Sequence, residues 1–236
     1  MLGNQTESIA LLLHRAAWSN TVEVTSHRVM QLPEKGFALG AGRLFSQQDK
    51  DLVADILTGQ KSTLSFIPDN VLARDSSGLS MVWFTPPRMA TVRFRENEYS
   101  VPMPTLVYVK TEGKPLRVFA AKGRARPSES TSLWTAPLGN INRNGTMCSG
   151  NVQLGSFRGT DSDRAACEAF AVEARATHLG DTNPVKGVDN HADFEAYIAK
   201  LEASKVKSFP STSLLPAQYQ GGPLTLRDLL EVEVAQ

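Results

Sequence analysis

The residues best suited to covalent chemistry lie in one short stretch that ends at Cys148. From residue 137 the stretch reads Pro-Leu-Gly-Asn-Ile-Asn-Arg-Asn-Gly-Thr-Met-Cys. It places a thiol just after a tight Asn144-Gly145 turn, with little apolar bulk around it, which is a poor setting for a buried cysteine. A partner can reach a thiol in such a loop, and nearby backbone N–H groups or an asparagine amide can stabilise the oxyanion of thioester attack. The stretch therefore predicts an acyl-carrying cysteine.

The second cysteine and the histidines give different signals. Cys167 lies between Ala166 and Phe170 on the apolar face of a predicted helix, so we expect it to pack in the core. The histidines are scattered without metal-ligand spacing, at His14, His27, His178 and His191. We therefore expect no metal site, and we interpret His178 as a residue at a helix end.

Composition narrows the classes of partner. The chain has 236 residues, 25 of them basic and 24 acidic, without the long basic run that nucleic acid or an anionic membrane would attract. The apolar run at residues 9–13 is too short to span a bilayer. Two cysteines cannot form a disulfide framework. We expect a cytoplasmic protein with one domain and extensions, and no cofactor.

The first half of the chain predicts a mixed α+β fold. Residues 8–40 carry short apolar runs and glycine turns typical of a β hairpin or meander. Ser46 and Asp49 have the form of a capping box, followed by an apolar helical face that stops at Gly59. Four short β-rich segments come next, and their spacing predicts a four-stranded antiparallel meander at residues 81–84, 91–94, 105–109 and 116–120.

Helices dominate the remainder. Asp161 is the expected cap of one helix that closes near His178, Asn190 begins a second, and Thr225 begins a last short one. The predicted domains are an N-terminal β extension (residues 1–45), a core (46–204) and a C-terminal loop with a short helix (205–236).

These motifs resemble those of the ubiquitin-conjugating enzymes. That family carries His-Pro-Asn, a short turn rich in Asn and Gly, and then the active cysteine. Asn140 stands at the family's distance before Cys148. Further matches in type and spacing are Ile141, Asn142, Asn144 and Gly145. The order of helix, four-stranded meander, active-site loop and C-terminal helices also agrees, so the resemblance implies a ubiquitin-conjugating-like core between about residues 46 and 201.

The departures from the motif are informative. Leu138 and Gly139 stand where the usual His and Pro would be, and Ser149 replaces the usual apolar residue after the cysteine. Together with the long N-terminal extension, they make the chain similar to the divergent bacterial group of ubiquitin-conjugating proteins called PRTRC system protein B. That resemblance implies a set of partners: a ThiF-like adenylating enzyme, a ubiquitin-like protein, a JAB-type metallopeptidase and a ParB-related protein.

The resemblance also implies roles for particular residues. Cys148 would accept an acyl group from the adenylating enzyme, and Asn140 would donate a hydrogen bond to the tetrahedral oxyanion. Asp161 and Asp163 are candidates for the acid that helps to deprotonate an incoming amine. Two alternatives stay open: a non-catalytic interaction module, in which the missing His-Pro pair signals lost activity, and a cysteine hydrolase, which would need a histidine beside Cys148 although the sequence offers none near the loop.

Overall fold

The computed structural model describes residues 8–15, 22–32, 36–47, 49–51, 53, 67–150, 152, 154–219 and 221–234. The chain divides into two compact units, Met1–Phe66 and Ile67–Gln236. The first unit contains the N-terminal strands, and the second contains the reactive loop. Within the described residues, no helix combines the length and the apolar character that crossing a membrane requires.

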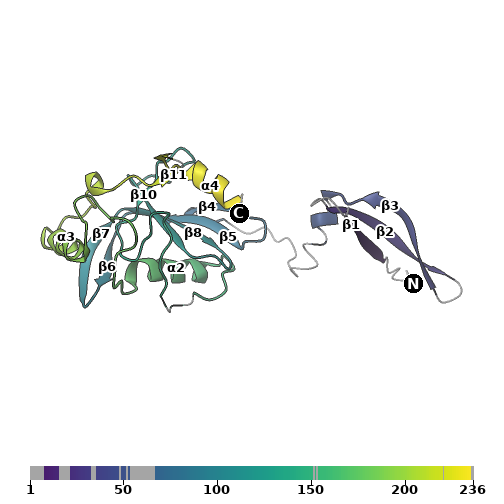
Figure 1. Cartoon of the computed structure of the whole chain (residues 1–236), viewed down its shortest axis with the longest axis horizontal. Helices are drawn as coiled ribbons and strands as arrows, with labels where there is room; N and C mark the ends of the chain where they lie inside the picture. Colours follow the sequence, from purple (N-terminus) through teal and green to yellow (C-terminus); the bar gives the residue numbers. More distant parts are fainter. Residues whose placement is uncertain are drawn as a thin grey trace. The chain divides into compact units, whose positions relative to one another are not determined.

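The first unit contains a three-stranded antiparallel sheet of β1 (Ile9–Arg15), β2 (Val22–Leu32) and β3 (Gly36–Leu44), in that order (Figure 1). The expected N-terminal strands are therefore confirmed. The predicted capping box also forms, because the Asp49 carboxylate accepts from the backbone N–H of Ser46 at 2.8 Å and the Ser46 hydroxyl accepts from the Asp49 N–H at 3.3 Å. Most of the helix expected up to Gly59 lies outside the described residues, and the boundary expected after residue 45 stays a prediction.

The second unit is built on a five-stranded antiparallel sheet. Its strands, in spatial order, are β10 (Trp134–Thr135), β9 (Arg117–Ala121), β8 (Thr105–Thr111), β5 (Ser80–Thr85) and β4 (Val71–Arg74). Between β5 and β8 the chain leaves this sheet and forms a separate hairpin of β6 (Arg88–Phe94) and β7 (Asn97–Met103).

This strand order corrects the predicted meander. Three of the four predicted segments lie in the sheet, but residues 91–94 pair with β7 in the separate hairpin, and the unpredicted β4 takes the sheet edge. The reason is the turn between β6 and β7, which consists of Arg95 and Glu96, with Arg95 at a φ of 52°. Tight hairpin turns with positive φ favour Gly, Asn or Asp, so an Arg-Glu turn gives no sequence signal.

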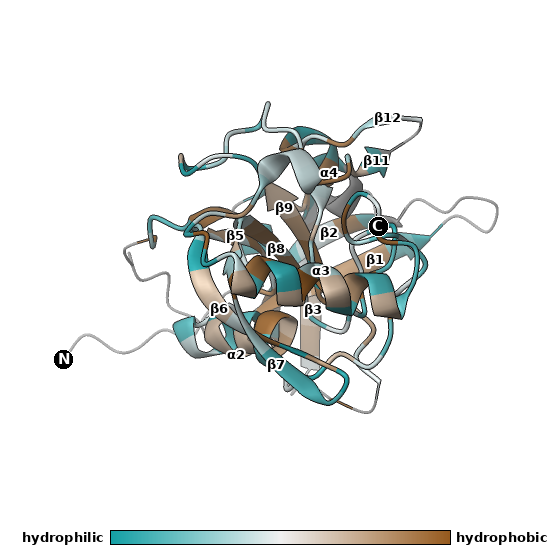
Figure 2. Cartoon of the chain, turned by 90° about the vertical axis from the view of Figure 1, so that its left-hand side faces the viewer, coloured by the Kyte–Doolittle hydropathy of each residue, from teal (hydrophilic) through white to brown (hydrophobic). Residues whose placement is uncertain are grey.

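Helices and the C-terminal segment cover the two faces of the sheet. On one face, α2 (Asp161–Glu173) buries Cys167, Ala171 and Val172, while α3 (His191–Ala203) packs beside β7. On the other face, α4 (Leu226–Val234) and the segment before it bury apolar side chains against β8 and β9. That segment includes a short 3-10 helix (Ser211–Ser213), β11 (Gln218–Tyr219) and β12 (Gly222–Pro223). Figure 2 shows the central strands β5 and β8 as mostly hydrophobic.

Local capping explains where these helices begin. The N-cap of α2 is Thr160, not the expected Asp161, and α2 ends at Glu173, so His178 lies beyond its last turn. The predicted caps of the other two helices are confirmed. Asn190 accepts a hydrogen bond from the Asp193 N–H at 3.0 Å, and the Thr225 hydroxyl accepts one from the Asp228 N–H at 3.2 Å.

Candidate active site

The predicted reactive stretch folds into a narrow loop closed by its own backbone. The N–H of Cys148 donates to the carbonyl of Asn140 at 2.8 Å, and the N–H of Asn142 donates to the carbonyl of Thr146 at 2.9 Å. At the tip, the N–H of Gly145 donates to the carbonyl of Asn142 at 2.8 Å. The two residues with predicted chemical roles, Asn140 and Cys148, therefore face each other at the base of the loop.

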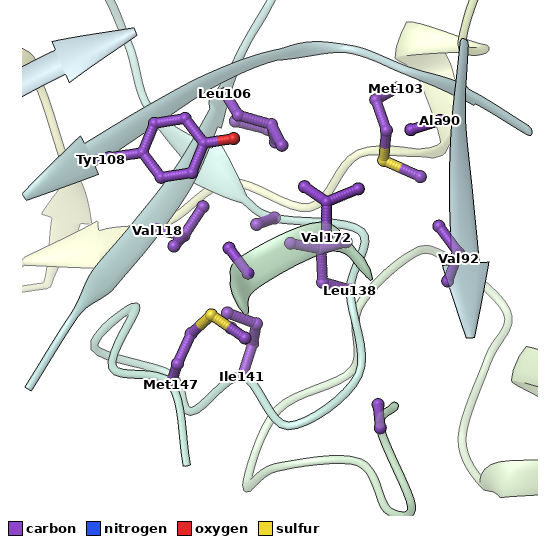
Figure 3. Close-up of a cluster of buried hydrophobic side chains, with 14 of the residues drawn as sticks. Ala90, Val92, Met103, Leu106, Tyr108, Val118, Leu138, Ile141, Met147 and Val172 are labelled. Atoms are coloured by element: carbon purple, nitrogen blue, oxygen red, sulfur yellow. The ribbon is translucent and has the colours of Figure 1, made fainter. Parts of the chain in front are cut away.

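Apolar side chains fasten this loop to the core. Leu138, Ile141 and Met147 are buried, and Figure 3 shows them with Val118 of the sheet and Val172 of α2. Leu138 stands where the ubiquitin-conjugating motif has its histidine. A fully buried leucine stabilises by about 1.5–3 kcal/mol through loss of apolar surface, so packing replaces the polar brace of the usual motif.

The loop is also joined to the start of β9. The N–H of Val118 donates to the carbonyl of Gly145 at 2.8 Å, and the N–H of Met147 donates to the carbonyl of Leu116 at 2.9 Å. Gly145 has a φ of 81°, and a Cβ there would lie 2.4 Å from the ring of Phe119. Only glycine fits this turn without strain, which is why the Asn-Gly dipeptide is needed at the tip.

A second segment, residues 176–181, also braces the loop. The N–H of Asn140 donates to the carbonyl of His178 at 2.9 Å, and the N–H of Arg143 donates to the carboxylate of Asp181 at 2.5 Å. The contact is close because Gly139 and Gly180 lack side chains. A Cβ on Gly139 would lie 2.5 Å from the Cβ of Ala176, and one on Gly180 would lie 1.9 Å from the carbonyl oxygen of Ile141.

The side chain of Asn140 is held but not satisfied. Its backbone has a φ of 56°, a conformation that Asn adopts more readily than most residues. Its Oδ1 atom is buried and has no hydrogen-bond partner among the described residues. A buried unsatisfied polar group costs about 1–3 kcal/mol, so the placement of this amide lowers stability, a cost that functional sites often retain.

Cys148 and Asn140 line the same pocket, which has a volume of about 330 Å³. Cys148 is partly exposed there, and His178 lies on the wall of the same pocket. The sequence offers no histidine close to the loop, but the fold brings one there. His178 is far from the loop in sequence and reaches it through the segment after α2, where Gly139 and Gly180 allow the close approach.

Comparison of the sequence with known protein families gives a match that includes this pocket. The sequence model of prokaryotic E2 family D matches residues 49–217, which is well over half of the chain and includes the whole pocket. The chain belongs to prokaryotic E2 family D. Neither the search of curated proteins nor the search of solved structures gives a match.

Membership of this divergent bacterial E2-like family accounts for the general architecture. The mixed α/β structure, with antiparallel sheets and few helices, is compatible with an E2-like fold. Family membership also indicates a ubiquitin-conjugating-like role and, in general terms, activity of the transferase type. The sheet β1–β3 of the first unit lies outside the matched residues.

The two acidic candidates do not reach this E2-like pocket. Asp161 forms an ion pair with Arg164 at 2.6 Å. Burial raises the pKa of Asp163, but N–H groups of Arg158 and Thr160 outweigh it and leave the pKa below its usual value. Neither side chain is among the lining residues of the pocket; the ion pair with Arg164 explains Asp161, and the capping box with Thr160 explains Asp163.

The other residues singled out in the sequence have structural roles. Asn142 and Asn144 hold the loop, since Asn142 Oδ1 accepts from the Asp181 N–H at 3.4 Å and Asn144 Oδ1 accepts from the Thr146 N–H at 3.0 Å. Cys167 is only 2% exposed, and burial raises the pKa of its thiol to about 11, which confirms it as a core residue. Among the described residues, no cluster of His, Cys, Asp and Glu could hold a metal ion.

Proposed function

We propose that this prokaryotic E2 family D protein is a thioester carrier, with Cys148 as the acyl-accepting residue and Asn140 as its partner. The observation that carries the proposal is their shared position, because both line one pocket at the base of a braced loop. Family membership supports the transferase class in general. The missing His-Pro pair does not argue against activity, because Leu138 and residues 176–181 supply the bracing.

Thioester exchange requires little from the protein except correct positioning of the reacting groups. The Cys148 thiolate attacks the carbonyl of a thioester on the adenylating enzyme, the old C–S bond breaks, and the departing thiolate takes up the proton that Cys148 lost. The Asn140 amide stabilises the tetrahedral oxyanion between the two steps. Because one thioester replaces another at nearly equal energy, orientation of the reacting groups supplies most of the acceleration.

The proposed donor is a ThiF-like adenylating enzyme, the cargo is a ubiquitin-like protein, and the acceptor is an amine or another thiol. A JAB-type metallopeptidase and a ParB-related protein are proposed as further members of the same set. The resemblance to PRTRC system protein B is the ground for these partners, and the balance of 25 basic and 24 acidic residues is consistent with protein partners rather than nucleic acid. We propose a cytoplasmic location because the two cysteines cannot form a disulfide framework.

His178 gives a second candidate function, a cysteine hydrolase, because an imidazole in the thiol pocket is one requirement of that chemistry. Two observations favour the carrier. In the described part of the chain no hydrogen bond joins Cys148 to a histidine, and the Nδ1 atom of His178 lies 3.3 Å from the hydroxyl of Thr177. A hydrolase would release its acyl group to water, whereas a carrier would hold it until an acceptor arrives.

The test is a non-reducing gel of the protein with ATP, the adenylating enzyme and the ubiquitin-like protein. We expect an adduct that a thiol reductant removes, present in wild type and Cys167→Ala and absent in Cys148→Ala. No adduct with a demonstrably charged adenylating enzyme would favour the non-catalytic interaction module. An adduct that disappears without acceptor in wild type but persists in His178→Gln would favour the hydrolase.

A further inference from the structure

A second pocket adjoins the one that holds Cys148. Its volume is about 420 Å³, within the range of about 300–1,000 Å³ that is usual for small-ligand sites. The two pockets share a wall of four residues, which are Met147, Ser149, Val152 and Phe170. Two of these, Met147 and Ser149, are the chain neighbours of Cys148, so the second pocket begins next to the reactive residue.

Lys110 gives this second pocket its chemical character. The residue is only 6% exposed, and its ammonium donates hydrogen bonds to the carbonyls of Thr111, at 2.9 Å, and of Lys114. An ammonium has three N–H donors, so one is left for a further acceptor. Within the described residues Lys110 forms no ion pair, and an opposite charge that acts on it is the carboxylate of Glu112, whose pKa the lysine helps to lower.

The one acid among the described lining residues, Glu112, is committed elsewhere. Its carboxylate accepts hydrogen bonds from the Phe157 N–H at 2.6 Å and from the Ser156 hydroxyl at 2.8 Å. These bonds, together with the positive charges of Lys110 and Arg158, hold the pKa of Glu112 below its usual value although burial opposes the shift. With Lys114 also on its wall, the pocket has more positive than negative charge and an unused buried donor.

The two pockets suit different parts of the reaction. Asn140 and His178 line the first pocket, so the attacking nucleophile and the oxyanion belong there. The acyl chain attached to the sulfur extends away from these groups. The second pocket, beyond the shared wall, is a neighbouring space that could receive it.

We infer that the pocket around Lys110 binds a carboxylate side chain close to the acylated end of the cargo's tail. The inference rests on the proposed function, because it requires an acyl chain on Cys148. It adds a specificity that the carrier role alone does not contain: tails with an Asp or Glu near their end are accepted in preference to neutral or basic ones, through a charge-assisted hydrogen bond to the Lys110 ammonium.

The test uses short synthetic peptides that end in glycine as an alkyl thioester, with Asp, Asn or Lys placed at successive positions before that glycine. Transfer of the peptide to the full-length protein is followed by intact mass, with thiol released in equal amount. At one position we expect Asp to be transferred about tenfold faster than Asn, the ratio that corresponds to one hydrogen bond to a charged group, with Lys slowest.

Variants identify the lysine responsible. We expect Lys110→Met to reduce the ratio of Asp to Asn rates to about one, while the matched surface variant Lys200→Met keeps the wild-type ratio. Equal rates for the three peptides in wild type, or an Asp preference that persists in Lys110→Met, would overturn the inference. The wild-type comparison requires no variant to fold, and transfer without any charge preference would leave the carrier role of Cys148 intact.

Discussion

The two cysteines of the second unit show how local structure decides what a thiol can do. Cys148 ends a loop whose backbone is closed by its own hydrogen bonds, and it opens onto a pocket with Asn140 and His178. Cys167 lies on the inner face of α2, and burial raises the pKa of its thiol to about 11. Both residues are free thiols, so the difference in chemistry comes from the loop in one case and the helix in the other.

The largest expected difference between the two sites is in alkylation. With a pKa of about 11, roughly one Cys167 thiol in a thousand is ionised at pH 8, and burial excludes the reagent further. We expect iodoacetamide to label Cys148 and to leave Cys167 unmodified in the native protein, as measured by peptide mass mapping. Equal labelling of both thiols in the folded protein would contradict the expected difference in reactivity between Cys148 and Cys167.

The same burial predicts a pH effect of definite sign. The folded state raises the pKa of Cys167 above that of an unfolded thiol, so folding keeps the proton bound. Its contribution to stability is therefore complete below the unfolded pKa of about 8.5 and is lost as the pH rises from there towards about 11. Urea titrations from pH 7 to 10 should show a decline that is smaller in Cys167→Ala.

The second-largest effect concerns the leucine that replaces the usual motif histidine. Leu138→Ala should lower the free energy of unfolding by about 2–5 kcal/mol, because it opens a cavity in the core that supports the loop. The control is Val152→Ala, since Val152 is 51% exposed and its truncation should change stability by less than about 0.5 kcal/mol. Equal effects in denaturant titrations would mean that Leu138 does not anchor the loop.

Gly180→Ala should lower stability less than Leu138→Ala but should still abolish thioester formation at Cys148. Gly180→Ala introduces a Cβ that would lie 1.9 Å from the Ile141 carbonyl oxygen, so the two segments must separate. We expect a loss of about 1–3 kcal/mol together with loss of thioester formation. Gly155→Ala is the matched control, because a Cβ there meets no atom within 4 Å. Normal thioester formation in Gly180→Ala would show that the brace is dispensable.

The smallest effect on folding is expected at Asn140. Asn140→Gly keeps the positive φ and removes the buried unsatisfied amide oxygen, so stability should change by less than about 1 kcal/mol. Transfer from the adenylating enzyme to Cys148 should nevertheless slow by about 10²–10³-fold, as for loss of an oxyanion donor. Unchanged single-turnover rates would remove Asn140 from the proposed chemistry.

The sequence predicted what depends on local residue patterns. The spacing from Asn140 to Cys148, the Asn-Gly tip and the caps at Asn190 and Thr225 are local features, and the structure contains all of them. The β6–β7 hairpin was missed because its Arg-Glu turn carries no residue typical of such turns.

Contacts between residues far apart in the sequence were harder to predict. His178 and Lys110 come near the reactive loop only through tertiary packing, and neither lies in a recognisable motif. The bracing function of Gly139 and Gly180 likewise depends on two segments meeting in space, which a single sequence does not specify.

The central claim, that Cys148 carries the acyl group, is tested most directly by intact-protein mass. The single-cysteine variant Cys167→Ala would be incubated with ATP, the adenylating enzyme and the ubiquitin-like protein, and then digested to locate the adduct. We expect a mass gain of one cargo minus one water on the peptide containing Cys148, reversed by a thiol reductant. A reductant-stable adduct on a lysine, or no adduct although the adenylating enzyme is charged, would contradict it.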